Sequence, residues 1–234
     1  MRAPARFVAY AALALLTGAA ARATPQANGA PDPSRFVRTV DNPWFPLRPG
    51  ATFVYRGVKD GEPSRDVVRV TSRTRLIQGV RCTAVSDRLY TSGALSERTT
   101  DWYAEDRNGT VWYFGEDTAE LDRSGNVTSR EGSWLAGVAG ARAGIFMPAR
   151  PGVGQRFRQE LLRGHAEDHF QVLSLRATVR VPAVSSRHAL LTKEWTPLEP
   201  DVVDHKLYVR GIGLVDERTI RGGDERNALV SWSR

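Results

Sequence analysis

The sequence predicts an all-β protein, a single-domain antiparallel curved sheet or half-open barrel with little helix. β-branched and aromatic runs are repeatedly separated by short turns that contain glycine, which is the pattern of an antiparallel meander. No segment sustains the 3.6-residue apolar repeat of an amphipathic helix. Because a sheet of about ten or more strands has to curl or close to bury one face, we expect the sheet to have a concave side.

The ordered part is expected to begin at 41–50, DNPWFPLRPG, where three prolines and a glycine exclude a helix. Trp44, Phe45 and Leu47 in this segment are expected to cap one end of the core. The strands predicted next are 52–58, 67–77, 80–91, 94–104 and 110–114. Asn108-Gly109 predicts a tight hairpin before the last of these strands, because both residues tolerate positive φ.

The segment 137–154 is rich in glycine and proline, and this composition predicts a long ordered loop. Its apolar centre, Ile145-Phe146-Met147, is unfavourable in water, since burying each such side chain contributes about 1.5–3 kcal/mol. The triplet therefore forms either a lid over one opening of the sheet or a part of the ordinary core. The strands predicted after it are 156–162, 168–175, 177–181, 189–196, 205–210, 214–219 and 228–232. The sequence also allows a short helix at 116–121 or at 185–191, in place of an entirely β chain.

Residues 1–23 are predicted to be a cleavable signal peptide. Arg2 and Arg6 form its positive start, and the charge-free apolar run that follows is shorter than the ~20 residues that a membrane span needs. Ala21-Arg22-Ala23 then matches the small-x-small pattern that a signal peptidase reads. The mature chain is thus expected to be secreted or periplasmic and to contain no transmembrane span.

We expect residues 24–40 to be a flexible polar leader and residues 41–234 to form one β domain. Cys82 is the only cysteine, so no internal disulfide can form. Cys82 lies in a strand-like run and is expected to behave as a small buried hydrophobe. The stability of the domain must therefore come from a packed core.

Basic residues outnumber acidic ones, 33 Lys and Arg against 26 Asp and Glu, for a formal net charge of +7. A nucleic-acid-binding surface would concentrate its bases on one face, with aromatic platforms between them. Here the arginines of the first hairpin strands are interleaved with Asp66 and Asp87. This pattern indicates a solvated sheet face, and no nucleic-acid partner is expected.

Four motifs resemble a family of uncharacterised secreted bacterial proteins. They are DNPxFPLxPG at 41–50, DWYAxD at 101–106, VWYFGED at 111–117 and TKEWTPLEP at 192–200. This resemblance implies no known activity. A further short motif, YxRGIGLV at 208–215, is similar to the final hairpin of lipoprotein-carrier-like half-barrels, and that similarity implies a curved sheet that binds apolar ligands.

The most concentrated set of potential metal ligands is His165, Glu167 and His169. In a strand all three side chains would point to one side, and in a helix the two histidines would still align. Zinc takes three or four protein ligands, and no clear further ligand follows in the sequence. A solvated, charged hairpin end is therefore favoured, and we expect neither a metal nor another cofactor.

A second set of residues combines aromatic and acidic side chains on predicted strands and supplies the candidates for ligand binding. They are Trp102, Tyr103, Trp112, Glu116, Asp117, Phe146, Glu194 and Trp195. Since adjacent strand residues face opposite sides, only one of Trp102 and Tyr103 can line a cavity. Carboxylates beside aromatic platforms would also suit glycoside hydrolysis, whereas core aromatics with charges at strand ends are the plainer interpretation. No residue is assigned as catalytic, because the sequence contains no GxSxG, phosphate-loop or HExxH motif.

These observations favour an exported protein that binds an apolar or amphipathic small molecule on the concave face of its sheet. An envelope structural or assembly factor that binds another protein is the alternative, and an acid- or metal-assisted hydrolase is the third possibility. A cavity lined by apolar and aromatic side chains would support the first. An exposed apolar patch would support the second, and convergent carboxyl groups or histidines with perturbed pKa values would support the third.

Overall fold

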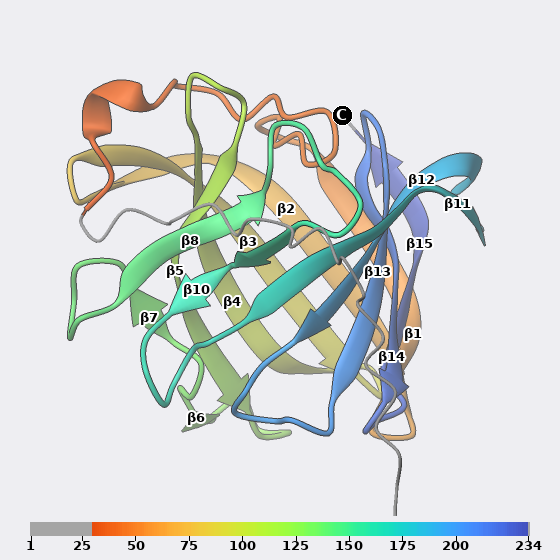
Figure 1. Cartoon of the computed structure of the whole chain (residues 1–234). Helices are drawn as coiled ribbons and strands as arrows, with labels where there is room; N and C mark the ends of the chain where they lie inside the picture. The colour runs from red at the N-terminus through yellow and green to blue at the C-terminus, as the bar shows by residue number, and fades with distance from the viewer. Residues whose placement is uncertain (1–29, 234) are drawn as a thin grey trace, which may run out of the picture.

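The computed structural model describes residues 30–233. The predicted signal peptide and its cleavage site lie outside the described residues. The described chain forms one antiparallel sheet of 15 strands that curls into a nearly closed barrel, preceded by a single turn of 3-10 helix (Figure 1). The predicted fold class is thereby confirmed. Over these residues no helix is long and apolar enough to cross a membrane.

The elements follow one another in the chain with short connections. They are η1 (Pro33–Arg35), β1 (Thr52–Lys59), β2 (Glu62–Ile77), β3 (Val80–Thr91), β4 (Ala94–Glu105), β5 (Val111–Leu121), β6 (Val127–Ser129), β7 (Trp134–Leu135), β8 (Arg142–Met147), β9 (Arg156–Arg158), β10 (Glu160–Leu161), β11 (His169–Val181), β12 (Val184–Trp195), β13 (Val203–Val209), β14 (Gly213–Arg221) and β15 (Arg226–Ser233). The residues 116–121 and 185–191, for which helices were an alternative, lie within the strands β5 and β12.

Three tight turns set the register of the first four strands. Asp60-Gly61, Gln78-Gly79 and Ser92-Gly93 each place both residues at positive φ, the geometry of a two-residue hairpin turn whose twist matches that of the strands. Each hairpin therefore pairs neighbours in the sequence, as β1 with β2, β2 with β3 and β3 with β4. Glycine at the second position of each turn is the local signal for this part of the fold.

The sheet closes at two places. β1 pairs with β15, so the first and last strands lie side by side (Figure 1). On the opposite side, β9 pairs with β11 while β10 pairs with β8, and only Gln159 separates β9 from β10. This short segment therefore joins the two remaining edges of the sheet. Gly144 in β8 permits the approach, because a side chain there would collide with the backbone of Gln159.

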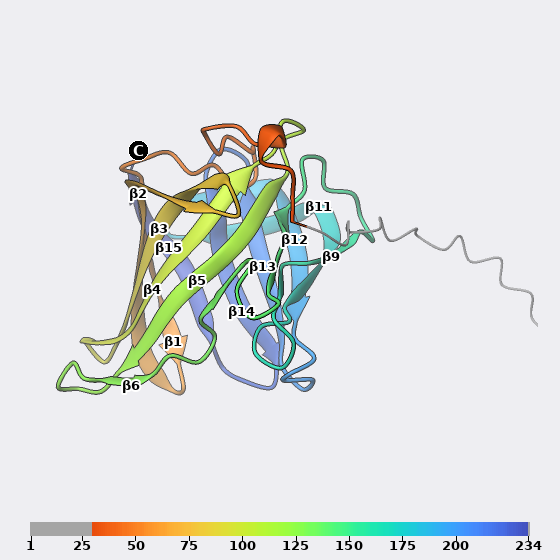
Figure 2. The same cartoon turned by 90° about the vertical axis from the view of Figure 1, so that its left-hand side faces the viewer.

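The N-terminal segment, residues 30–50, lies across one end of the barrel, as Figure 2 shows with η1 at the top of the view. Asn42 is almost fully buried, and its side-chain amide donates hydrogen bonds to the carbonyl oxygens of Gly109 (2.7 Å) and Pro148 (3.2 Å). Its side-chain oxygen accepts from the backbone N–H of Trp44 at 2.9 Å. One side chain thus ties the segment to two loops at this end of the barrel.

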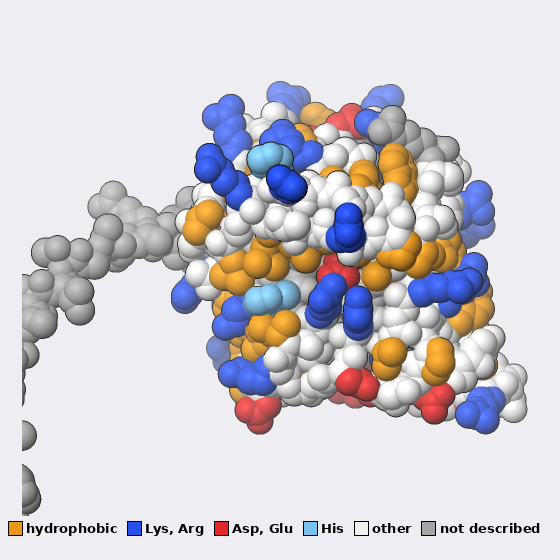
Figure 3. All heavy atoms as spheres, turned by 90° about the vertical axis from the view of Figure 1, so that its right-hand side faces the viewer, with side chains coloured by type: hydrophobic (Ala, Val, Ile, Leu, Met, Phe, Trp, Pro, Cys, Tyr) orange, Lys and Arg blue, Asp and Glu red, His pale blue; other side chains and the backbone are white. Residues whose placement is uncertain are grey.

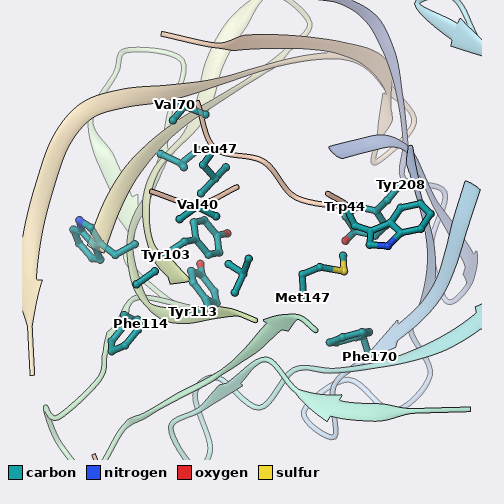
Figure 4. Close-up of a cluster of buried hydrophobic side chains, with 14 of the residues drawn as sticks. Val40, Trp44, Leu47, Val70, Tyr103, Tyr113, Phe114, Met147, Phe170 and Tyr208 are labelled. Atoms are coloured by element: carbon teal, nitrogen blue, oxygen red, sulfur yellow. The ribbon is translucent and has the colours of Figure 1, made fainter. Parts of the chain in front are cut away.

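The apolar side chains of this segment point into the barrel. Trp44 and Leu47 are each 6% exposed, and the ring of Phe45 packs against Tyr103 and Phe146. The prediction that Trp44, Phe45 and Leu47 cap one end of the core is confirmed. In the close-up of Figure 4, Leu47 lies above Tyr103, and Trp44 lies beside Tyr208 across the barrel.

Residues 33–40, assigned from the sequence to the flexible leader, also contact the barrel. The ring of Phe36 meets Trp112 and Phe114 edge-on, with ring centroids 6.2 and 5.5 Å apart. Val40 is 2% exposed and forms a β-bridge with Leu47. This stretch therefore adds apolar contacts at the capped end.

The predicted loop at 137–154 is wrong over its central part. Residues 142–147 form β8, which pairs with β5 and β10. Met147 is 1% exposed, and Phe146 packs in the interior, so the triplet belongs to the wall and core of the barrel and forms no lid. The composition was misleading because Gly144 serves the close approach of β8 to Gln159 and does not interrupt the strand.

Candidate functional site: a carboxyl-lined cavity inside the barrel

A cavity of about 270 Å³ lies inside the barrel beneath the N-terminal segment. At the capped end its lining is apolar and comes from Phe45, Pro46, Leu47, Phe146 and Ile212. Around the walls its lining is strongly acidic. The carboxyl side chains that face it are Asp66, Asp87, Asp101, Glu160, Asp168, Glu194 and Glu217, and the basic side chain that faces it is Lys206.

Strand alternation explains why these acids point inward. Along β2, Asp66 shares the parity of Val68 and Val70, and all three side chains line the cavity. Along β3, Asp87 likewise shares the parity of Val85, and both side chains line the cavity. The arginines Arg65 and Arg69 have the opposite parity and are exposed. The prediction of a solvated face is therefore confirmed for these arginines and wrong for Asp66 and Asp87, which belong to the interior face.

Asp66 and Asp87 form a coupled pair on neighbouring strands. Burial raises the pKa of Asp66 to about 6, although a hydrogen bond with Asp87 lowers it. Burial and the charge of Asp66 together raise the pKa of Asp87 well above its ordinary value. The pair therefore retains a proton near neutral pH, since two buried carboxyl groups in contact resist losing both protons.

A second pair surrounds the hydroxyl group of Tyr113. This hydroxyl donates a 2.6 Å hydrogen bond to Oδ1 of Asp101. Burial, with the charge of Asp87 in addition, raises the pKa of Asp101 to about 7. Burial, with the charge of Asp101 in addition, raises the pKa of the neighbouring Glu116 to about 8. The ring of Tyr103 stacks on Tyr113 at 4.7 Å and extends this polar wall with an aromatic face.

On the opposite part of the wall, Lys206 stands between two carboxylates. Its ammonium nitrogen lies 2.9 Å from Glu194 and 3.1 Å from Glu217. Burial alone would lower the pKa of Lys206, but these two carboxylates outweigh burial and hold it well above its ordinary value. Glu194 accepts further hydrogen bonds from the hydroxyls of Thr192 and Tyr208. Two carboxylates inside this barrel therefore bind the ammonium group of Lys206.

The structure brings some of the predicted site residues to the cavity and leaves others outside. Tyr103, Phe146 and Glu194 line it. Glu116 lies next to this lining through its interaction with Asp101. Asp117, the following residue of β5, is exposed on the outer surface, as the change of parity along a strand requires.

The predicted tryptophans of β4 and β5 pack on the outside of the sheet. Trp102 is covered by the guanidinium group of Arg75, 4.4 Å above its ring. The indole N–H of Trp112 donates to Asp106 at 3.2 Å. Only one of the adjacent pair Trp102 and Tyr103 faces the cavity, and it is Tyr103. The selection of both tryptophans as ligand-binding candidates therefore has no support in their position.

The histidine cluster is divided by a turn before β11. The backbone of His165 closes a turn onto Leu162, and the carboxylate of Glu167 accepts from the backbone N–H of Gly164. His169 stacks on Trp195 at 5.5 Å. Within residues 30–233 no three His, Cys, Asp or Glu side chains are grouped to hold a metal ion.

The functional residues missed by sequence reasoning are the inward acids and the lysine. Asp168 stands between Glu167 and His169, and its side chain enters the cavity. Lys206, Glu217 and Asp66 occupy strand positions whose parity matches buried apolar neighbours. That parity was the available signal, since a charge at an apolar-face position of a strand indicates an interior polar group.

No family model and no curated protein sequence matches the chain. Among solved structures, it is similar to a protein of Parabacteroides distasonis ATCC 8503 named a "putative lipoprotein". The two share 10% sequence identity over 81% of this chain and 98% of that chain, with a TM-score of 0.39. A likeness at this level carries no argument about function.

Proposed function

We propose that this protein binds a small amphipathic molecule inside its barrel, after export of the chain from the cytoplasm. The observation that carries the proposal is the cavity of about 270 Å³, which combines an apolar capped end with polar walls. Small-molecule sites are typically concave and largely apolar, with a few polar groups that orient the ligand. This volume is slightly below the usual size range of about 300–1,000 Å³, which favours a small ligand.

The aromatic groups at the capped end supply the apolar part of such a site. The rings of Phe45, Tyr103, Tyr113 and Phe146 contact one another with centroids 4.4 to 5.8 Å apart. All four line the cavity, so a ligand in contact with them would exchange water for aromatic surface. The carboxyl-rich walls would then meet its polar end.

A neutral fluorescent probe tests this proposal. N-phenyl-1-naphthylamine should bind the mature protein with saturable enhancement of its fluorescence. Val68→Trp places a bulky ring in the cavity and should abolish binding. Val67→Trp is the matched control, because Val67 has the opposite parity on the same strand and should leave binding intact. Absence of saturable binding by the parent protein, or equal binding by both variants, would refute the proposal.

A hydrolase is the second candidate, because the carboxyl groups of Asp101 and Glu116 converge with pKa values of about 7 and about 8. A carboxyl group that is protonated at neutral pH is the form that a general acid requires. Hydrolysis of chromogenic glycosides or esters by the parent protein, lost in Asp101→Asn, would support this function. Turnover that is unchanged in both Asp101→Asn and Glu116→Gln would exclude these groups as its source.

A further inference from the structure

Resting on the proposed function, we propose that the molecule bound in the barrel is an organic cation, an amine with an apolar part. Its ammonium group would bind the wall carboxyl groups, and its apolar part would lie among the aromatic rings at the capped end. The first observation is an excess of hydrogen-bond acceptors on the cavity wall. Glu160 Oε2, Asn227 Oδ1 and Asp66 Oδ1 are buried and have no donor within hydrogen-bonding geometry among the described residues.

These unpartnered atoms are deeply placed. Glu160 is 8% exposed and Asn227 is 7% exposed, and both line the cavity. Glu160 interacts with the indole N–H of Trp134 and with the carboxyl group of Asp168, but Oε2 of Glu160 and the N–H of Trp134 both remain outside hydrogen-bonding geometry. Buried oxygen acceptors normally have a donor, from protein or from ligand. A ligand that carries several N–H groups would supply what these oxygens lack.

The second observation is the charge of the lining. Lys206 is the cation among the lining residues, and its ion pairs are with Glu194 and Glu217. The remaining carboxyl groups of the lining have no ion pair with Lys, Arg or His among residues 30–233; they are Asp66, Asp87, Asp101, Glu160 and Asp168. Basic side chains lie instead on the outside, as one outer face of the barrel shows (Figure 3). The interior therefore offers a positive ligand several carboxyl groups that no basic side chain occupies, and these groups can pair with it once they lose their protons.

Two further features select an organic cation over a metal ion. No group of three or more potential metal ligands is assembled within residues 30–233, so the carboxyl groups are spread along the wall. The aromatic faces of Tyr103, Tyr113 and Phe146 border the same space and attract cations through their π electrons. Lys206, held at 2.9 and 3.1 Å by two carboxylates, shows how this interior holds an ammonium group.

The raised pKa values agree with this assignment. Carboxyl groups such as Asp101 and Glu160 hold protons because burial penalises their charged forms. An ammonium group bound beside them would favour the charged forms. Binding of an amine near neutral pH should therefore release protons, and the observed enthalpy should depend on the ionisation enthalpy of the buffer.

A matched series of three ligands tests the inference by isothermal titration calorimetry. 2-Phenylethylamine, 2-phenylethanol and 3-phenylpropionate have the same ring and differ in charge. We expect the amine to bind at least ten-fold more tightly than the alcohol, and the carboxylate to bind more weakly than both. Glu160→Gln and Asp101→Asn should each weaken the amine about ten-fold and leave the alcohol unchanged. Asp117→Asn, on the outer surface of β5, is the control and should change neither.

The possible failures of the inference and of the proposed function differ. The inference is wrong if the amine and the alcohol bind with equal affinity, or if only the alcohol binds. The proposed function still holds in either case, provided that N-phenyl-1-naphthylamine binds. An amine affinity that Glu160→Gln and Asp101→Asn both leave unchanged also overturns the inference. If the parent protein does not bind N-phenyl-1-naphthylamine, the proposed function is wrong and the inference with it.

Discussion

The buried carboxyl group of Asp101 should make the folded state less stable as the pH rises. Its pKa is about 7 in the folded protein against an ordinary value of 3.8, because of burial and the charge of Asp87. Well below pH 4 the group is protonated in both the folded and the unfolded state. Between pH 4 and pH 7 the unfolded chain releases a proton that the folded protein keeps, so stability falls as the pH rises and levels off above about pH 7.

The magnitude follows from the size of this shift. A shift of about three pKa units corresponds to about 4 kcal/mol, at about 1.4 kcal/mol per unit. Asp101→Asn removes the ionisation and keeps an oxygen that can accept the hydrogen bond from Tyr113. The variant should therefore match the parent protein at pH 4 and exceed its stability by about 2–4 kcal/mol at pH 8. Relief of the charge repulsion on Glu116 acts in the same direction.

Urea unfolding followed by tryptophan fluorescence at pH 4 and pH 8 measures this difference. Asp117→Asn is the control, because Asp117 forms an exposed ion pair with Arg130, and such pairs contribute about 0–1 kcal/mol. Its free energy of unfolding should change by less than about 1 kcal/mol at either pH. If Asp101→Asn is no more stable than the parent protein at pH 8, ionisation of Asp101 does not destabilise the folded state. The pKa of Asp101 would then not be raised by burial.

Three other expectations concern the capped end, the cavity wall and the thiol. Asn42→Ala should lower the free energy of unfolding by about 3 kcal/mol in urea titrations, because two buried carbonyls lose their donor; a loss below about 1 kcal/mol would show that water replaces the amide. Phe146→Ala should cost about 3 kcal/mol and enlarge the cavity, so a probe larger than N-phenyl-1-naphthylamine should gain affinity; an unchanged size limit would contradict the position of Phe146 in the wall. Cys82, whose pKa burial raises to about 12, should react with Ellman's reagent only after unfolding, and rapid reaction of the native protein would show that the thiol is accessible.

The strands and hairpins could be predicted from the sequence because their signals are local. Turn pairs such as Asp60-Gly61 and Ser92-Gly93 adopt positive φ at both residues, so they specify which neighbouring strands pair and in what register. The proline-rich segment with Trp44 could be recognised as a non-helical cap for similar reasons. Alternation along β4 likewise determined that Trp102 and Tyr103 face opposite sides.

Closure of the barrel depends on contacts that no local pattern encodes. β9 and β10 join opposite edges of the sheet through one short segment, and β1 meets β15 across nearly the whole chain. Composition around Gly144 predicted a loop, because a glycine required for close packing looks the same in a sequence as one that breaks a strand. Of the two alternatives for Ile145-Phe146-Met147, a lid or a part of the core, the structure therefore supports the core.

The all-β class, the positions of the first hairpin turns and the alternation along regular strands such as β2 follow from the sequence alone, whereas the bulge in β5 that turns both Tyr113 and Glu116 towards Asp101 does not. Which of the two faces forms the interior depends on the curvature of the whole sheet, and this curvature places Asp66, Asp101, Glu160 and Glu217 around one cavity. The physical reason is that alternation sorts side chains within a strand, whereas curvature and closure assign one face to the inside and bring distant strands together. The raised pKa values of these carboxyl groups arise from that burial and shared proximity.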